Sequence, residues 1–138
     1  MESRLEAPDL DVGFVMTGSR VFSNETVADF CRVTGDKNPL HHDEEFARGT
    51  RFGRPIVPGL LVASLFTDIA SHWYVFAQEV TLSFRAPVFI GETVNATIRI
   101  TSRQGALLAA DFECRTEEGR LVIEGALKGM TLSAIMRK

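Results

Sequence analysis

Cysteine is scarce in this sequence. The 138 residues include only Cys31 and Cys114, which form no C-x-x-C pair. Two cysteines are too few for a disulfide framework, and each lies in an apolar pattern, so we expect structural free thiols in a reducing compartment. A secretory signal is also missing, because the acidic segment 1–11 has no apolar core. Both absences predict a cytoplasmic protein.

The chain also lacks an excess of charge of one sign. Its net charge of −3 gives no electrostatic reason to expect nucleic-acid binding. The one apolar segment long enough for a membrane span, 58–77, contains Asp68 and His72. An aspartate at the bilayer centre costs about 2.5–3.5 kcal/mol, so we expect a buried helix there and no membrane. The length suits one domain over residues 1–138, with no repeats or linkers.

Hydrophobic periodicity predicts an α+β fold. Residues 13–22 alternate loosely and predict an edge strand, and the amphipathic helix that follows has Ser23 as its N-cap and ends at Gly35. A long loop comes next, with a possible turn of helix at residues 43–48. Loops of this length tend to be functional. From Gly59 to about Phe76 we expect a helix that is apolar on most of its circumference.

Four strand patterns separated by short glycine turns follow this helix, at residues 80–86, 94–100, 108–114 and 121–129. They predict an antiparallel meander with one buried face, and Gly125 and Gly129 suggest bulges in its last strand. The sheet can cover the apolar helix only in part, and it leaves an edge strand unpaired. We therefore expect self-association, with a homodimer as the simplest form.

The loop before the apolar helix carries the most specific motif, and several later segments extend it. They are Gly-Asp-Lys-Asn-Pro-Leu-His at 35–41, Phe-Ala-Arg at 46–48, Phe-Gly-Arg-Pro-Ile-Val at 52–57, Gly-Leu at 59–60, Phe-Arg-Ala-Pro-Val at 84–88 and Gly-Glu-Thr-Val at 91–94. Together they resemble the MaoC-like (R)-specific enoyl-CoA hydratases and 3-hydroxyacyl-thioester dehydratases, over roughly residues 14–132.

The resemblance implies a hotdog fold, usually dimeric, in which an antiparallel sheet wraps one long central helix. It implies hydration of trans-2-enoyl thioesters to (R)-3-hydroxyacyl thioesters. Asp36 and His41 match the family's catalytic pair, and Gly59 matches the glycine whose backbone N–H faces the thioester carbonyl. Asn38 and Ser64 are expected as supporting residues. Many members of the family carry His where this chain has Pro58, which changes the pocket wall.

The residue types also suit this chemistry on physical grounds. Hydration needs a base that activates water and an acid that protonates carbon C2 of the enoyl group. It also needs hydrogen-bond donors that stabilise the negative charge on the thioester oxygen. A carboxylate and an imidazole, such as Asp36 and His41, can hold the water and move both protons. The first N–H groups of a helix that starts at Gly59 have no partner inside the helix. They can therefore donate hydrogen bonds to the thioester oxygen while it carries negative charge. The alternative role for Asp36 is an ordinary turn residue after a helix.

Three arginines and a group of acidic residues have competing interpretations. Arg48, Arg51 and Arg54 recur every third residue, and they suit either the phosphates of coenzyme A, the acidic surface of an acyl carrier protein, or simply a solvated loop. His42 and the acidic residues 43–45 show no regular ligand spacing. We therefore expect no metal and no other cofactor.

Two rival functions remain open at this point. One is a hotdog thioesterase, which would cleave the thioester instead of hydrating the alkene. The other is a non-catalytic acyl-thioester-binding subunit of a larger dehydratase. The Asp-x-Asn-Pro-x-His order favours hydration, and no G-x-S-x-G elbow supports a serine hydrolase.

Overall fold

The computed structural model describes residues 10–72 and 75–137. Its elements in chain order are β1 (Val15–Val21), α1 (Asn24–Thr34), the short 3-10 helix η2 (Pro39–His41), α2 (Glu44–Arg48), α3 (Gly59–Ser71), β2 (Val75–Phe84), β3 (Thr93–Gln104), β4 (Leu107–Thr116), β5 (Leu121–Thr131) and the 3-10 helix η3 (Leu132–Ile135). None of the described helices is long and apolar enough to span a membrane.

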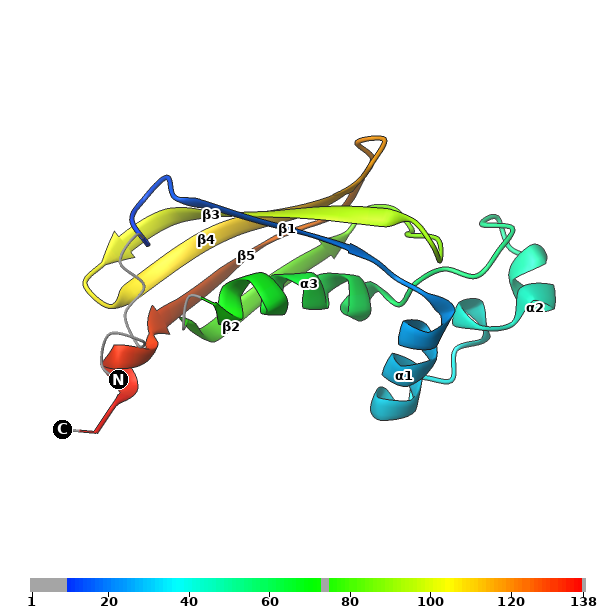
Figure 1. The fold of residues 1–138 in the computed structure, drawn as a ribbon, viewed down its shortest axis with the longest axis horizontal. Coiled ribbons are helices and arrows are strands. Elements are labelled where there is room, and N and C mark those ends of the chain that lie inside the picture. Colours follow the sequence, from blue (N-terminus) through cyan, green and yellow to red (C-terminus); the bar gives the residue numbers. More distant parts are fainter. Residues whose placement is uncertain (1–9, 73–74, 138) are drawn as a thin grey trace.

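The strands form one antiparallel sheet in the order β1-β3-β4-β5-β2. Helix α3 lies along one face of this sheet, and α1 and α2 lie together beyond one of its ends (Figure 1). The expected α+β hotdog arrangement, a sheet curved over one central helix, is confirmed. The expected edge strand is also confirmed, because β1 pairs only with β3 among the described strands.

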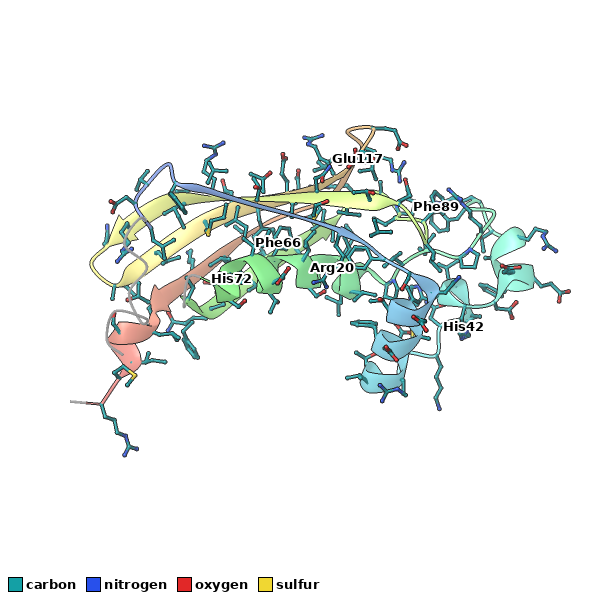
Figure 2. The ribbon with its side chains drawn as sticks, in the orientation of Figure 1. Arg20, His42, Phe66, His72, Phe89 and Glu117 are labelled. Atoms are coloured by element: carbon teal, nitrogen blue, oxygen red, sulfur yellow. The ribbon has the colours of Figure 1, made fainter. Side chains whose placement is uncertain are left out.

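The core lies between α3 and the inner face of the sheet. Alternate residues of β3 and β4 are buried there, as their period-two pattern predicts: Val94, Ala96, Ile98, Ile100, Leu108, Ala110, Phe112 and Cys114. The ring of Phe66 in α3 lies 4.0 Å from the ring of Phe112, and Figure 2 shows it between helix and sheet. Burying each of the Val, Leu, Ile and Phe side chains among them contributes about 1.5–3 kcal/mol, so this interface holds the helix in place.

The central helix ends earlier than expected. It stops at Ser71, with His72 as its C-cap, and Phe76 lies in strand β2 instead. The prediction was wrong because a short apolar segment fits a helix and a strand equally well when no glycine or proline separates them.

The topology also differs from a simple meander. Strands β3, β4 and β5 follow one another as expected, but β2 pairs with β5 and not with β3. The connection from β2 to β3, residues 85–92, therefore passes the ends of β5 and β4. There it meets the segment before α3, where Val57 N–H donates to Val88 O at 2.7 Å and Ile56 pairs with Phe89. The connection at residues 85–92 therefore lies against the segment that leads into α3.

Gly125 and Gly129 do not mark bulges in β5. The irregularity beside Gly129 lies in the facing strand, between Ala77 and Glu79. A Cβ at Gly125 would collide with the carbonyl of Thr81 and the ring of Phe112, and a Cβ at Gly129 would collide with the carbonyl of Phe76. The two glycines thus let β2 approach β5 closely, the other role that glycine has inside a strand.

Both cysteines are free, as expected. Burial, together with the nearby charge of Glu113, raises the pKa of the Cys114 thiol to about 12. Burial and the charge of Asp36 also raise the pKa of Cys31. Both shifts favour the neutral thiol, which is the unreactive form.

The raised pKa of Cys114 predicts a loss of stability in alkali. Above about pH 8.5 the unfolded thiol releases its proton while the native thiol keeps it, so rising pH favours unfolding by about 1.4 kcal/mol per unit. Urea unfolding at pH 8 and pH 10 should therefore show a smaller pH-dependent loss in Cys114→Ala, by at most about 2 kcal/mol. Cys31→Ala, whose thiol is only partly buried, is the control. Equal losses in wild type and Cys114→Ala would contradict the prediction.

Candidate active site

The end of α1 positions Asp36. The helix is capped by Ser23, whose Oγ accepts Thr26 N–H at 3.1 Å, and it ends at Gly35 with φ of 75°. Both ends are as predicted. The backbone N–H of Asp36 donates to Thr34 Oγ1 at 3.3 Å, and its Oδ1 accepts the Asn38 N–H at 3.0 Å. One carboxylate oxygen therefore stabilises the turn, and Oδ2 stays available for other partners.

The next turn positions His41. Asn38 caps η2 by accepting Leu40 N–H at 3.0 Å, so its side chain supports the turn that holds the imidazole. His41 is only 8% exposed, and its Nδ1 lies 2.9 Å from the carbonyl oxygen of Ile56. A carbonyl only accepts, so Nδ1 carries a proton, and in the neutral form of the ring Nε2 is then the bare nitrogen.

Asp36 and His41 face one another through their remaining atoms. Their Oδ2 and Nε2 are 3.5 Å apart, which is longer than a direct hydrogen bond. With His41 neutral, both atoms are acceptors. A water molecule that donates one hydrogen to each satisfies both, so the pair is suited to holding a nucleophilic water.

The pair lies in the wall of a cavity of about 490 Å³. Asp36, His41 and Gly59 all line this cavity, so the structure places the three residues together. Most of the remaining wall is apolar: Phe30, Phe52, Ile56, Val57, Pro58, Leu60, Val62, Phe84, Ala86, Pro87, Val88, Val122 and Ile123. Such a mixture, apolar walls with a few polar groups, is typical of a small-molecule site.

The start of α3 supplies backbone donors to this wall. Pro58 precedes the helix as its N-cap and gives no side-chain hydrogen bond. Leu61 and Val62 N–H bond to Pro58 O, whereas no described group accepts the N–H of Gly59 or Leu60. A Cβ at Gly59 would lie 2.6 Å from Cε1 of Phe84, so any larger residue must displace that ring. The missing side chain therefore allows close packing at the helix start.

The three arginines lie in different places. Arg51 lines the cavity, and its guanidinium lies 5.1 Å from the centre of the Phe52 ring. Arg54 lies over the Phe89 ring at 4.1 Å, outside the lining residues. Arg48 is exposed in the last turn of α2 and is also outside the lining.

Ser64 lies apart from the pair. Its hydroxyl donates to Leu61 O at 2.5 Å, and it lines a second cavity between α3 and β2. The structure gives it no place in the wall beside Asp36 and His41.

Several groups of the site carried no signal in the sequence. The carbonyl of Ile56, which fixes the proton on His41, belongs to the backbone and could be any residue type. Thr34 and Phe84 line the cavity from α1 and from the edge strand β2. Segment 84–88 is part of the resemblance to the family, but its alternating strand pattern does not predict that it lines the cavity.

No group of three or more His, Cys, Asp or Glu side chains within residues 10–72 and 75–137 is arranged to hold a metal ion. His42, beside His41, is exposed, and Figure 2 shows it at the end of the molecule formed by α1 and α2.

Comparisons with known proteins agree with the motif. The MaoC-like domain family matches residues 7–114. The chain is 34% identical to the (R)-specific enoyl-CoA hydratase of Aeromonas caviae, over 96% of this chain and 98% of the relative. It is 35% identical to the mitochondrial 3-hydroxyacyl-acyl-carrier-protein dehydratase FERN of Solanum lycopersicum, over 92% of this chain and 81% of the relative.

The fold gives the same result. The solved structure of the (R)-hydratase from A. caviae, described as involved in PHA biosynthesis, superimposes with a TM-score of 0.85 at 34% identity. The match covers 91% of this chain and 99% of that one. Motif, sequence similarity and fold therefore agree that the chain belongs to the MaoC-like family of hydratases and dehydratases.

Proposed function

We propose that this protein is a hydro-lyase that adds water to trans-2-enoyl thioesters to give (R)-3-hydroxyacyl thioesters, and that it catalyses the reverse dehydration. The observation that carries the proposal is the Asp36–His41 pair in an apolar cavity beside the uncapped start of α3. The hydratases and dehydratases among its relatives support the same reaction. In this proposal each chain forms one domain, the protein is cytoplasmic, and the reaction needs no metal or cofactor.

The geometry suggests how the reaction proceeds. A water held by Asp36 Oδ2 and His41 Nε2 gives one proton to the pair as its oxygen bonds to C3. The carbon–carbon double bond opens, the electron pair moves toward the thioester oxygen, and the pair returns a proton to C2. Because two interacting groups share their titration, the proton is assigned to the pair and not to either residue. The Gly59 N–H stabilises the oxygen while it carries charge.

The acyl thioester is carried either by coenzyme A or by an acyl carrier protein. Of Arg48, Arg51 and Arg54, Arg51 is the best placed to meet a phosphate, because it alone of the three lines the cavity. Arg54 and Arg48 are further from it and would contact a carrier only outside the cavity. Guanidinium groups bind phosphate in a bidentate way, which suits either carrier.

Product analysis separates hydration from thioester cleavage. Purified protein is incubated with trans-2-enoyl-CoA substrates of increasing chain length. Hydration removes the absorbance of the conjugated enoyl group and releases no free thiol. Release of free coenzyme A as the main product would contradict the proposal and favour a thioesterase.

We also propose a homodimer whose cavities lie near the subunit boundary. Strand β2 is an edge of the described sheet, and large apolar side chains on it and at the start of α3 are about half exposed: Leu60, Phe76, Val80 and Phe84. Covering this surface with a second copy removes both the open edge and the apolar area from water. Leu60 and Phe84 also line the cavity, so the second copy would lie beside the site.

Analytical ultracentrifugation at micromolar concentration should give twice the 15.3 kDa mass of the chain. Val80→Asp, which places a charge on the exposed edge, should shift the protein toward monomer, whereas Val33→Asp on the exposed face of α1 should not. A wild-type monomer that turns over substrate would refute the homodimer.

A further inference from the structure

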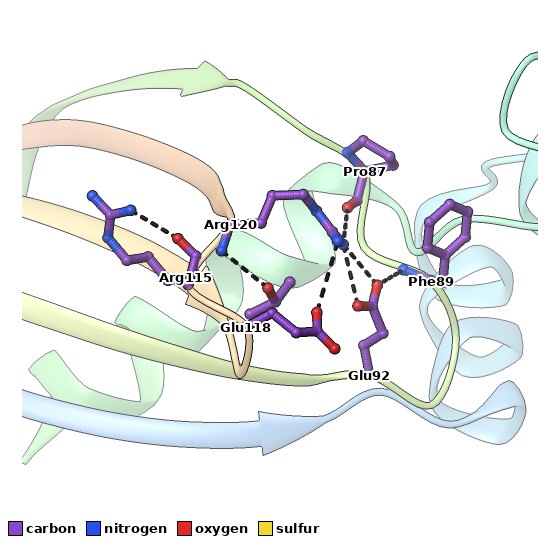
Figure 3. Close-up of polar contacts among 8 residues, drawn as sticks. Pro87, Phe89, Glu92, Arg115, Glu118 and Arg120 are labelled. Atoms are coloured by element: carbon purple, nitrogen blue, oxygen red, sulfur yellow. Dashed lines mark hydrogen bonds and ion pairs between the residues drawn. The ribbon is translucent and has the colours of Figure 1, made fainter.

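Arg120 and Glu92 form a charged pair at the end of the sheet next to the cavity. Arg120 Nη2 donates to Glu92 Oε1 at 2.9 Å and Oε2 at 3.2 Å, and to the carbonyl of Pro87 at 3.0 Å. Glu92 Oε1 also accepts the backbone N–H of Phe89 at 2.7 Å. Glu92 and Arg120 directly precede β3 and β5, and Figure 3 shows their side chains meeting beside Pro87 and Phe89. The pair therefore binds this segment at both Pro87 and Phe89.

The segment held by this pair is bonded in turn to the catalytic region. Val88 O, between the two bound residues, accepts the Val57 N–H at 2.7 Å. The neighbouring Ile56 pairs with Phe89, and its carbonyl is the acceptor for His41 Nδ1 at 2.9 Å. Val57 is followed by Pro58 and then by the first residue of α3. One continuous set of contacts thus runs from Arg120 to both the imidazole and the helix start.

The cost of this arrangement argues for a specific role. The Nε of Arg120 is buried and has no hydrogen-bond partner. Burying a donor without a partner is unfavourable, so the hydrogen bonds that Arg120 makes through its other atoms must hold this side chain in place. The side chain of Glu92 is only 18% exposed. Its hydrogen bonds to Arg120 and Phe89 are therefore stronger than those of a carboxylate in water.

We propose that Arg120 and Glu92 are positioning residues for the active site. By fixing Pro87 and Phe89 they hold Val88 against Val57, which places the Ile56 carbonyl so that His41 keeps its proton on Nδ1. Neither residue is among those lining the cavity. The proposal rests on the proposed function for its kinetic consequence, but its effect on the imidazole is independent of any substrate.

The first test is the tautomer of His41, measured by ¹⁵N NMR. The chain has three histidines, so the ring signals are few enough to assign. Wild type should show His41 protonated on Nδ1, and Arg120→Met should shift it toward a mixture of the two tautomers, because the acceptor is displaced. Arg115→Met is the matched control. Arg115 bonds to Glu113 and to the Gly119 carbonyl in the same region without touching the 87–89 segment. The His41 tautomer in Arg115→Met should therefore stay as in wild type.

The second test is kinetic. Arg120→Met should lower kcat for enoyl-thioester hydration by about ten- to a hundredfold with little change in KM, because small displacements of reacting groups have effects of this size. Glu92→Gln keeps an acceptor for Phe89 N–H but weakens the bond to Arg120, so it should give a smaller loss in the same direction. It also serves as the second variant if Arg120→Met fails to fold.

The outcomes separate the two proposals. A folded Arg120→Met or Glu92→Gln protein with the wild-type His41 tautomer overturns the positioning role. A shifted tautomer in a protein that hydrates no enoyl thioester even as wild type supports the positioning role and overturns the proposed function. A fall in melting temperature alone, with tautomer and kcat unchanged, means that the pair only stabilises the fold and also overturns the proposal.

Discussion

Asp36→Asn and His41→Gln should each abolish most hydration while the circular dichroism spectrum stays native. Asparagine can still accept the Asn38 N–H that stabilises the turn, but it has lost the charge and basicity of Oδ2. Glutamine at position 41 can still donate to the Ile56 carbonyl, but it cannot accept and return a proton. Removing a general acid–base group typically costs about 10²–10⁴ in rate.

Steady-state hydration of one enoyl-CoA, with spectra recorded for each variant, checks this prediction. His42→Gln is the matched control, because that imidazole is adjacent in sequence but exposed, and it should retain the wild-type rate. The double variant should be little worse than either single one, since the two side chains act as a unit. Hydration near the wild-type rate in Asp36→Asn or His41→Gln would show that the pair is not the catalytic machinery.

Gly59→Pro should lower turnover by about 10²–10³, the usual cost of one oxyanion donor. Proline is tolerated in the first turn of a helix and has no N–H to offer. The preceding residue, Pro58, already has the extended φ of −53° and ψ of 132° that a following proline requires. The backbone should therefore accept the change.

A proline at position 59 also adds a Cβ, which would meet the Phe84 ring. Gly59→Ala adds the same atom and keeps the N–H, so it isolates the steric part. Both variants carry the same steric change, and only Gly59→Ala keeps the donor, so we expect Gly59→Ala to lose much less activity than Gly59→Pro. Melting temperature and sedimentation show whether both variants remain folded and assembled. Equal activities in the two variants would assign the oxyanion role to another group.

Local rules predicted much of this structure. The ends of α1 follow from Ser23 and Gly35, and the buried faces of β3 and β4 follow from strict alternation, because capping and side-chain period depend on neighbouring residues alone. The motif at 35–41 likewise placed Asp36 and His41 close enough to face one another.

Contacts between distant segments could not be predicted in this way. The pairing of β2 with β5 depends on how the 85–92 connection crosses the sheet, and alternation within a strand carries no information about its partner. The Ile56 carbonyl and the Arg120–Glu92 pair belong to the same crossing. Ser64 follows Gly59 by little more than one helical turn, yet its side chain faces the groove between α3 and β2.

Chiral analysis of the product tests the central claim most directly. Wild-type protein is incubated with a short trans-2-enoyl-CoA, and the 3-hydroxyacyl product is separated by enantiomer. If Asp36 and His41 deliver water from one side of a substrate held in the cavity, a single enantiomer forms. The proposed reaction makes it the (R) enantiomer, and its formation is lost in Asp36→Asn. A racemic or (S) product, or an (R) product that persists in Asp36→Asn, would contradict the account.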